Sequence, residues 1–424
     1  TYRDMSAEFM EEFYDWDVNL NGTGVAGRGD LTSFESRINK RFDENTNLNY
    51  LATLTYTKDF TDHSLSVLAA YNSISQVDEL LEAGRSPLPT SNNLDQIDGA
   101  PDTSDSNSGN TIDYGLRSVF GRLNYGYKDK YLVEANLRYD GTSRFPAEGR
   151  FEVFPSFSVG WVISKEDFFN VDFISSLKAR ASWGELGNQN IENYRYFTTY
   201  ATEAGTSFGG TTVPSILENK DLGNSIITWE TKTSKNIGLD AAFFKGKLNF
   251  SAEYYEEETK DILVDTTLPF LLGANGPVGN EATVENKGFE FSLGYRGKIG
   301  SDLNYSIKAN VATNQNEVIS VGNPLFERPD RKPGQSIDPH FGYISEGLFV
   351  DQAEIDAAPD HSAIGQTLPG DIRYADINGF DAEGNLTGVA DGKIDAADRT
   401  ELGNPFPGLT YGALFGMDYK GFDF

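Results

Sequence analysis

Apolar and polar residues alternate with a period of two in the adjacent segments VFGRLNYGY (119–127) and YLVEANLRY (131–139). This period is the pattern of a β-strand with one apolar and one polar face. The tight turn Lys128–Lys130 separates the two segments, so we expect them to pair as a hairpin. Aromatic residues gather at the strand ends, as they do where a wall crosses a membrane interface. The pattern predicts a sheet whose apolar face meets lipid and whose polar face lines a lumen.

The hairpin pattern recurs along most of the chain. Further hairpins are expected across the turns Lys58–Asp62, Lys245-Gly246 and Lys298–Asp302, within about fourteen candidate strands in all. We expect one antiparallel meander in sequence order, with helix confined to short pieces. The residues expected to face lipid are Leu123, Tyr125, Val133, Leu137, Leu239, Phe250, Phe291 and Ile307, and those expected to face the lumen are Arg122, Asn124, Glu134, Arg138, Asp240 and Glu253.

Tight turns alternate with long polar connections along the chain. The long connections cover residues 76–112, 140–151, 185–228, 264–283 and 317–408. Short turns at one rim and long loops at the other are typical of outer-membrane barrels, whereas a soluble sandwich lacks that order. Ser164–Ser176 is an exception, a longer link on the expected short-turn side.

A soluble core is the alternative to lipid for the apolar face. A soluble sheet of this length would need helices or a second sheet as cover, and the sequence offers no amphipathic helix of adequate length. No run reaches the roughly 18 to 20 apolar residues of a membrane helix, but a barrel strand needs only ~9–11 alternating residues. The predicted fold class is therefore all-β, a transmembrane antiparallel β-barrel with long extracellular loops.

The chain is strongly acidic, with 64 Asp and Glu against 35 Lys and Arg and a formal net charge of −29. Such a surface repels nucleic acid, so we expect no nucleic-acid partner. It also offers oxygen ligands to divalent cations, with a merely solvated acidic surface as the alternative. The absence of Cys excludes disulfides and thiolate chemistry. With three His and no catalytic motif, we expect no enzyme.

The four tryptophans are candidates for stacking on sugar rings. They are Trp16, Trp161, Trp183 and Trp229. Because Trp161 and Trp183 lie in strand patterns, we expect them in an interface belt instead.

An acidic loop, defined here as residues 376–398, carries the strongest site signal. With 379–390 set aside as an insertion, it reads D-x-N…D-G-K-I-D-x-x-D, which approximates an EF-hand-like calcium loop. The expected Ca²⁺ ligands are side-chain oxygens of Asp376, Asn378, Asp391 and Asp395, the carbonyl of Lys393 and the closing carboxylate of Asp398. The insertion and the closing Asp depart from the usual motif, and an Asx-rich turn cluster without metal is the alternative. Either would stiffen a long extracellular loop.

Six ordered segments carry a family resemblance. They are FGRLNYGYKDKYLVEANLRYDGTSRF (120–145), FPSFSVGWVISKEDFF (154–169), LKARASWGELGNQNIENY (177–194), and residues 227–263, 284–299 and 370–412. Together these segments resemble the SusC-like (SusC/RagA-type) TonB-dependent outer-membrane transporters. The resemblance covers about residues 110–424, while residues 1–110 match only in strand pattern. It implies part of a 22-stranded barrel with a plug domain inside. It also implies a TonB partner and a SusD-like surface lipoprotein over the extracellular mouth.

Two departures from this family affect the expected domain plan. The plug and the TonB-engaging segment are not visible, and TYRDMSAEFMEEF is not a signal peptide. We expect residues 1–424 to be a partial barrel that includes the long extracellular region 317–408, with Phe424 at a truncation edge.

The resemblance implies import of oligomeric nutrients, either glycan fragments or peptides, across the outer membrane. The alternative is a surface-exposed binding or adhesion protein with calcium-stiffened loops and no transport. A passive porin is disfavoured, because the long acidic loops and the ordered family segments exceed what diffusion needs.

Overall fold

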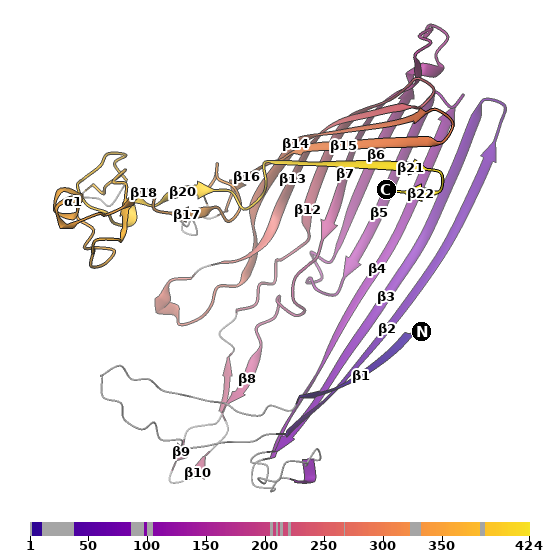
Figure 1. The fold of residues 1–424 in the computed structure, drawn as a ribbon. Coiled ribbons are helices and arrows are strands. Elements are labelled where there is room, and N and C mark those ends of the chain that lie inside the picture. The colour runs from indigo at the N-terminus through magenta and orange to yellow at the C-terminus, as the bar shows by residue number, and fades with distance from the viewer. Residues whose placement is uncertain are drawn as a thin grey trace.

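The computed structural model is an all-β molecule built on one large antiparallel sheet (Figure 1). It describes residues 2–10, 38–85, 97–99, 105–203, 207–208, 211–212, 215–218, 222–266, 268–322, 332–381 and 386–424. The sheet has 14 strands, which follow one another as neighbours in chain order, apart from β16, which pairs with β14. The predicted meander is therefore confirmed.

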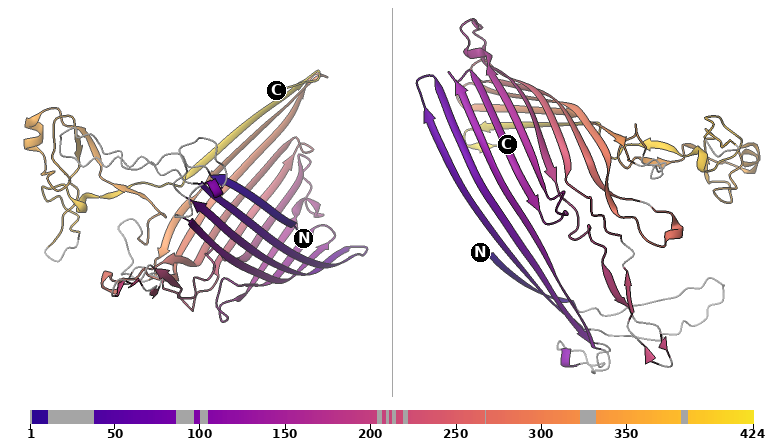
Figure 2. Two further views of the ribbon diagram at one scale, coloured as in Figure 1. Left: turned by 90° about the horizontal axis from the view of Figure 1, so that it is seen from below. Right: turned by 180° about the vertical axis from the view of Figure 1, so that it is seen from behind.

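Most strands of this sheet are long, and several exceed the length that a membrane crossing needs. They are β1 (Tyr2–Met10), β2 (Ile38–Asp59), β3 (His63–Arg85), β4 (Asp105–Tyr127), β5 (Tyr131–Thr142), β6 (Phe151–Val162), β7 (Ile174–Asn188), β12 (Glu230–Phe243), β13 (Leu248–Asp265), β14 (Val278–Ile299), β15 (Leu303–Thr313), β16 (Gln315–Ser320), β21 (Leu409–Tyr419) and β22 (Phe422–Asp423). The sheet is strongly curved (Figure 2).

Short elements occupy the long connections. They are the two-stranded antiparallel pairs β8 (Tyr200–Glu203) with β11 (Ser215–Glu218), β9 (Ser207–Phe208) with β10 (Thr211–Thr212), β17 (His340–Gly342) with β20 (Thr400–Gly403) and β18 (Ser345–Leu348) with β19 (Ile372–Tyr374), and the helix α1 (Gln352–Ala357). As expected, helix is confined to short pieces. Among the described residues, no helix is long and apolar enough to cross a membrane.

Local turn chemistry fixes the hairpin of β4 and β5 across Lys128–Lys130. Val119 pairs with Tyr139 and Tyr127 with Tyr131, as predicted. Lys128 and Asp129 both have positive φ, 51° and 50°, and the Lys130 amide donates to the Tyr127 carbonyl at 2.9 Å. Two successive positive φ values define a type I′ turn, whose twist matches that of the flanking strands.

Register assigns the two faces of the sheet. Residues directly opposite one another in antiparallel strands share a face. One apolar row joins Leu123, Ala135, Phe157 and Trp183 across β4 to β7. A polar row runs beside it from β3 to β12 through Ser66, Asn124, Glu134, Ser158, Ser182 and Asn236. The predicted split into an apolar and a polar face is confirmed.

Two rims of different character bound the sheet. The tight turns gather along the upper right edge in Figure 1, and the long connections leave from the opposite end. The predicted longer link on the tight-turn side is present, since β6 ends at Val162 and β7 begins at Ile174. This ordering is the asymmetry of an outer-membrane barrel.

The predicted long connection 76–112 is wrong in extent. β3 and β4 remain paired through Gln76 with Tyr114 as far as Arg85 with Asp105. The backbone ladder does not depend on side-chain polarity, and polar residues are solvated once a strand has passed beyond the apolar band. The change from apolar to polar residues in the sequence therefore shows where the apolar band ends, but the strands continue beyond it.

Residues 340–381 and 386–403 form a compact folded unit within the predicted long region 317–408. The strand pairs β17–β20 and β18–β19 close it, and Phe349, His361 and Ile394 are buried inside it. Both Figure 1 and Figure 2 show this unit standing away from the sheet.

Candidate functional site: the polar face and its long-loop rim

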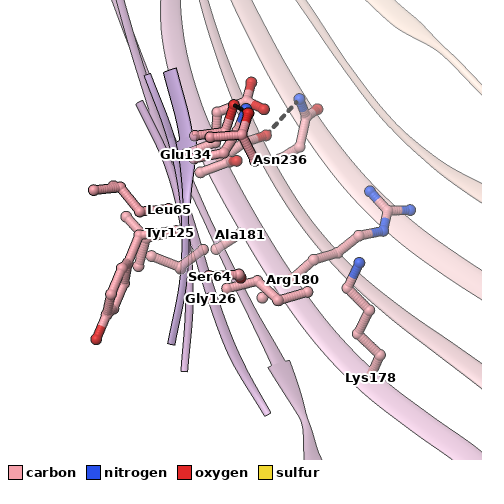
Figure 3. Close-up of a pocket in the computed structure, with 18 of the residues that line it drawn as sticks. Ser64, Leu65, Tyr125, Gly126, Glu134, Lys178, Arg180, Ala181 and Asn236 are labelled. Carbon is pink, nitrogen blue, oxygen red and sulfur yellow. Dashed lines mark hydrogen bonds between the residues drawn. The ribbon is translucent and has the colours of Figure 1, made fainter. Parts of the chain in front are cut away.

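The polar face of the sheet is hollowed into an open pocket of about 540 Å³. Its lining crosses β2 to β7 and β12 and includes all six residues of the polar row. Figure 3 shows Leu65 and Tyr125 on one side of the strands, and Arg180 and Lys178 on the other. The residues expected to face a lumen thus lie on the hollowed face.

Hydrogen bonds join the polar side chains across the strands. Arg122 Nε donates to Asn136 Oδ1 at 2.8 Å, and Asn136 Nδ2 donates to Glu134 Oε1 at 2.9 Å and to Ser156 Oγ at 3.2 Å. Because these groups satisfy one another, the wall presents an ordered polar surface instead of separate charges.

Arg180 is the most constrained cation of this face. Its guanidinium donates to Glu253 on β13 at 2.6 Å and to Asp240 on β12 at 3.2 Å. Gly238 on β12 lies between Arg180 on β7 and Glu253 on β13, and a Cβ there would stand 2.6 Å from Arg180 Cζ. The absence of a side chain at Gly238 therefore lets Arg180 reach across β12. Neighbouring Lys178 has no ion-pair partner within the described part of the chain.

A small hydrophobic core closes over the polar face near the long-loop rim. It consists of Phe145, Phe154, Ile227 and Trp229, with Ile227 and Phe145 fully buried. The Trp229 ring packs edge-on against Phe145 at 5.5 Å and Phe154 at 5.3 Å between ring centroids. Trp229 Nε1 also donates to the Arg150 carbonyl at 3.0 Å. We call this cluster the rim core.

The rim core joins three connections that are distant in the sequence. The Thr228 hydroxyl donates to the Gly149 carbonyl at 3.1 Å. Asn280 accepts from the Thr228 amide and donates to the Thr228 carbonyl, both at 2.9 Å. Arg144 lies over the Tyr114 ring at 4.7 Å and donates to Asn193 at 3.1 Å. The loops at this rim are therefore fixed to one another and to the wall.

The tryptophans have different environments. Trp161 and Trp183 lie on the apolar face and are 39% and 40% exposed, and their place in an interface belt stays a prediction. Trp229 is buried in the rim core, so its ring is not available to stack on a sugar. Trp16 lies outside the described residues.

A carboxylate on the longer tight-turn link fastens the ends of two strands. Glu166 accepts from the Tyr131 hydroxyl at 2.6 Å, from Trp161 Nε1 at 2.9 Å and from Lys130 Nζ at 3.2 Å. The hydrogen bond from Tyr131, and next that from Trp161, lower the pKa of the Glu166 carboxyl to about 2. No motif or periodicity in the sequence indicates a role for Glu166, because its partners come together only through the register.

The acidic loop places its candidate calcium ligands in one compact region, where they accept hydrogen bonds from backbone amides. Asp376 accepts from Asp391 N at 3.1 Å and Gly392 N at 2.7 Å. Asn378 accepts from Gly379 N at 3.0 Å and Gly388 N at 2.5 Å.

The second half of the acidic loop forms a short turn around a buried carboxylate. Asp398 is fully buried and accepts from the amides of Ile377, Asn378 and Asp395 at 2.8 to 3.1 Å. Asp395 caps the 3₁₀ turn Ala396–Asp398 through Ala397 N at 2.8 Å.

The remaining two candidate ligands also take part in local backbone contacts. Asp391 Oδ1 accepts from the Lys393 amide at 3.0 Å, and the Lys393 backbone forms an isolated parallel β-bridge with that of Asp360. Within the described residues, no group of three or more His, Cys, Asp or Glu side chains is arranged to hold a metal ion. Calcium binding by this loop stays a prediction.

A model of the family described as "TonB dependent receptor-like, beta-barrel" matches residues 6–420. TonB-dependent receptor P3 of Formosa agariphila is 30% identical over 425 residues, which cover 95% of this chain and 39% of that protein. TonB-dependent receptor SusC of Bacteroides thetaiotaomicron is 29% identical over 324 residues, which cover 73% of this chain and 30% of SusC.

Solved structures agree on the fold. The structure titled "Structure of the RagAB peptide importer in the 'closed-closed' state" superimposes with a TM-score of 0.77 at 21% identity, over 92% of this chain and 42% of that chain. The chain spans less than half the length of each of these relatives. The family match also extends beyond the motifs quoted above, into residues that matched only in strand pattern. The chain therefore belongs to the TonB-dependent receptor family and forms part of its outer-membrane β-barrel.

Proposed function

We propose that the protein to which this β-barrel portion belongs imports oligomeric nutrients across the outer membrane, energised by TonB and assisted by a SusD-like surface lipoprotein. The observation that carries the proposal is the family match over 6–420 on a chain whose polar face is hollowed. The family is one of receptors, not enzymes. A SusD-like partner is supported by the likeness to the RagAB importer, and the substrate class, glycan or peptide, stays open.

The polar face suits transport because its polar groups are ordered and few of its charges are free. Arg180 is already neutralised by Asp240 and Glu253, and the hydroxyls and amides of the polar row offer neutral contacts beside the carboxylate of Glu134 and Lys178, which is unpaired among the described residues. A path that conducts needs binding weak enough for the ligand to leave. The rim core would hold the long-loop end open at a fixed width while other parts of the protein move.

Uptake by cells tests this proposal directly. A strain that lacks the gene would be compared with one complemented by it, using fluorescent oligosaccharides and fluorescent peptides as separate probes. Entry of one probe class into the periplasm, abolished by deleting TonB, is the expected result. Surface binding of a probe without TonB-dependent entry would contradict import and support the adhesion alternative.

A further inference from the structure

Four exposed cations lie together at the tight-turn rim. They are Lys245 and Lys247 between β12 and β13, and Arg296 and Lys298 at the end of β14. The two pairs are joined by a hydrogen bond from Arg296 N to the Lys247 carbonyl at 2.8 Å. We call these four side chains the rim cation cluster.

This cluster lacks compensating acid in a chain that is otherwise rich in it. Neither 241–250 nor 293–301 contains an Asp or Glu. No side chain of the cluster has an ion-pair partner among the residues that the structure describes, and nearby Asp302 pairs with Lys420 at 3.6 Å. With 64 acidic residues available in the chain, four adjacent uncompensated cations require a separate explanation.

Lysines at the opposite rim are arranged differently. Each of four lysines on β12 to β14 has a carboxylate partner on the same or the adjacent strand. The pairs are Lys232–Glu257 at 2.7 Å, Lys235–Glu256 at 2.6 Å, Lys260–Glu258 at 3.0 Å and Lys287–Glu285 at 2.6 Å. Unpaired cations are therefore not a general property of these strands.

The rim cation cluster lies next to an apolar row in the sequence, although the register places Lys247, Arg296 and Lys298 on the polar side of the sheet. An apolar row of Phe243, Leu248, Tyr295 and Ile307 crosses β12 to β15 directly beside it. The Phe243 ring stacks with Phe173 at 6.3 Å, and the Tyr295 ring contacts Tyr305 at 5.8 Å. Aromatic rings of this kind mark the boundary between acyl chains and headgroups, so the turns just beyond them lie at headgroup level.

We infer that the rim cation cluster binds the phosphates of anionic phospholipid headgroups in the leaflet that meets the tight-turn rim. Clustered Lys and Arg next to membrane-spanning segments attract anionic lipid. Arg296 and Lys298 are on the polar face of β14, but they stand at the end of the strand, where long cationic side chains can extend past the rim to headgroup level. The inference is independent of what the protein transports.

Lipid selectivity of the full-length receptor tests the inference. The receptor would be placed in nanodiscs of phosphatidylethanolamine with a minor fraction of phosphatidylglycerol, and bound lipid would be counted by native mass spectrometry. The rim variant K245Q/K247Q/R296Q/K298Q should lose most of the phosphatidylglycerol preference, by about fivefold for each cation removed. The matched control K232Q/K235Q/K260Q/K287Q removes four cations from the opposite rim and should keep the preference.

Two further arms keep the test decisive. Heat-modifiable migration on a gel confirms a folded barrel, and K245Q/K247Q alone serves if the quadruple variant fails to fold. Raised salt should lower the preference of the wild type more than that of the rim variant. Equal phosphatidylglycerol binding by the wild type and a folded rim variant would overturn the inference. Equal losses in the rim variant and the control would overturn it too, because they would indicate a nonspecific charge effect.

Discussion

Replacing Trp229 with Ala should open the long-loop rim without unfolding the sheet. The side chain is 4% exposed, contacts two aromatic rings and donates one hydrogen bond. Truncating a buried Trp costs about 3–5 kcal/mol, and losing the hydrogen bond adds about 0.5–1.5 kcal/mol. Because the rim core is local to three connections, this loss should appear as local opening. A loss of about 4 kcal/mol corresponds to a roughly thousandfold fall in hydrogen-exchange protection.

Hydrogen exchange read by mass spectrometry would follow peptides covering 143–150 and 224–229. Trp183→Ala is the matched control, since Trp183 lies on the apolar face and is 40% exposed. Trp229→Phe should retain most of the packing and lose only the donated hydrogen bond, with an intermediate effect. Unchanged protection of both peptides in Trp229→Ala would refute the reasoning, as would an equal effect of the Trp183 control.

Three other expectations concern single sites. Gly238→Val should displace Arg180 from Glu253 and lower thermal stability, whereas Gly294→Ala, which meets open space, should change little in the same melting experiment. The lowered pKa of Glu166 means that its contribution to stability is complete above the ordinary carboxyl value of 4.5 and is lost only as the pH falls through about 2. At pH 3 the link 163–173 should therefore resist pepsin in the wild type and be cut in Glu166→Gln. If the acidic loop binds Ca²⁺, calorimetry should detect a site that Asp391→Asn weakens, and chelation should loosen the loop but not the sheet; no heat of binding would favour the Asx-turn alternative.

The sheet could be predicted from the sequence because its signal is local and repeated. Alternation on both sides of Lys128–Lys130 determines the hairpin, and one correct register determines which side chains share a face. The strand ends were less predictable, as the pairing of Arg85 with Asp105 shows, because polar strand residues resemble loop residues.

The rim core and the Arg180 ion pairs could not be predicted in the same way. Phe145 and Ile227 lie in irregular connections, where no periodicity indicates burial. Arg180 on β7 meets Glu253 on β13 only because a single strand, β12, lies between them and carries Gly238 directly opposite both residues. Such contacts depend on the pairing of strands that are distant in the sequence.

Single-cysteine accessibility tests most directly whether one face meets lipid and the other a lumen. The chain has no Cys, so single substitutions along β4 and β5 need no background correction within it. In the full-length receptor in membranes, Cys at positions 122, 124, 134 and 138 should react with a water-soluble maleimide once the lumen is open to reagent. Cys at positions 123, 125, 133 and 137 should resist that maleimide and be quenched, when fluorescently labelled, by brominated lipid. A reactivity pattern without period two, or one with the two sets exchanged, would contradict a wall with one lipid-facing and one lumen-facing side.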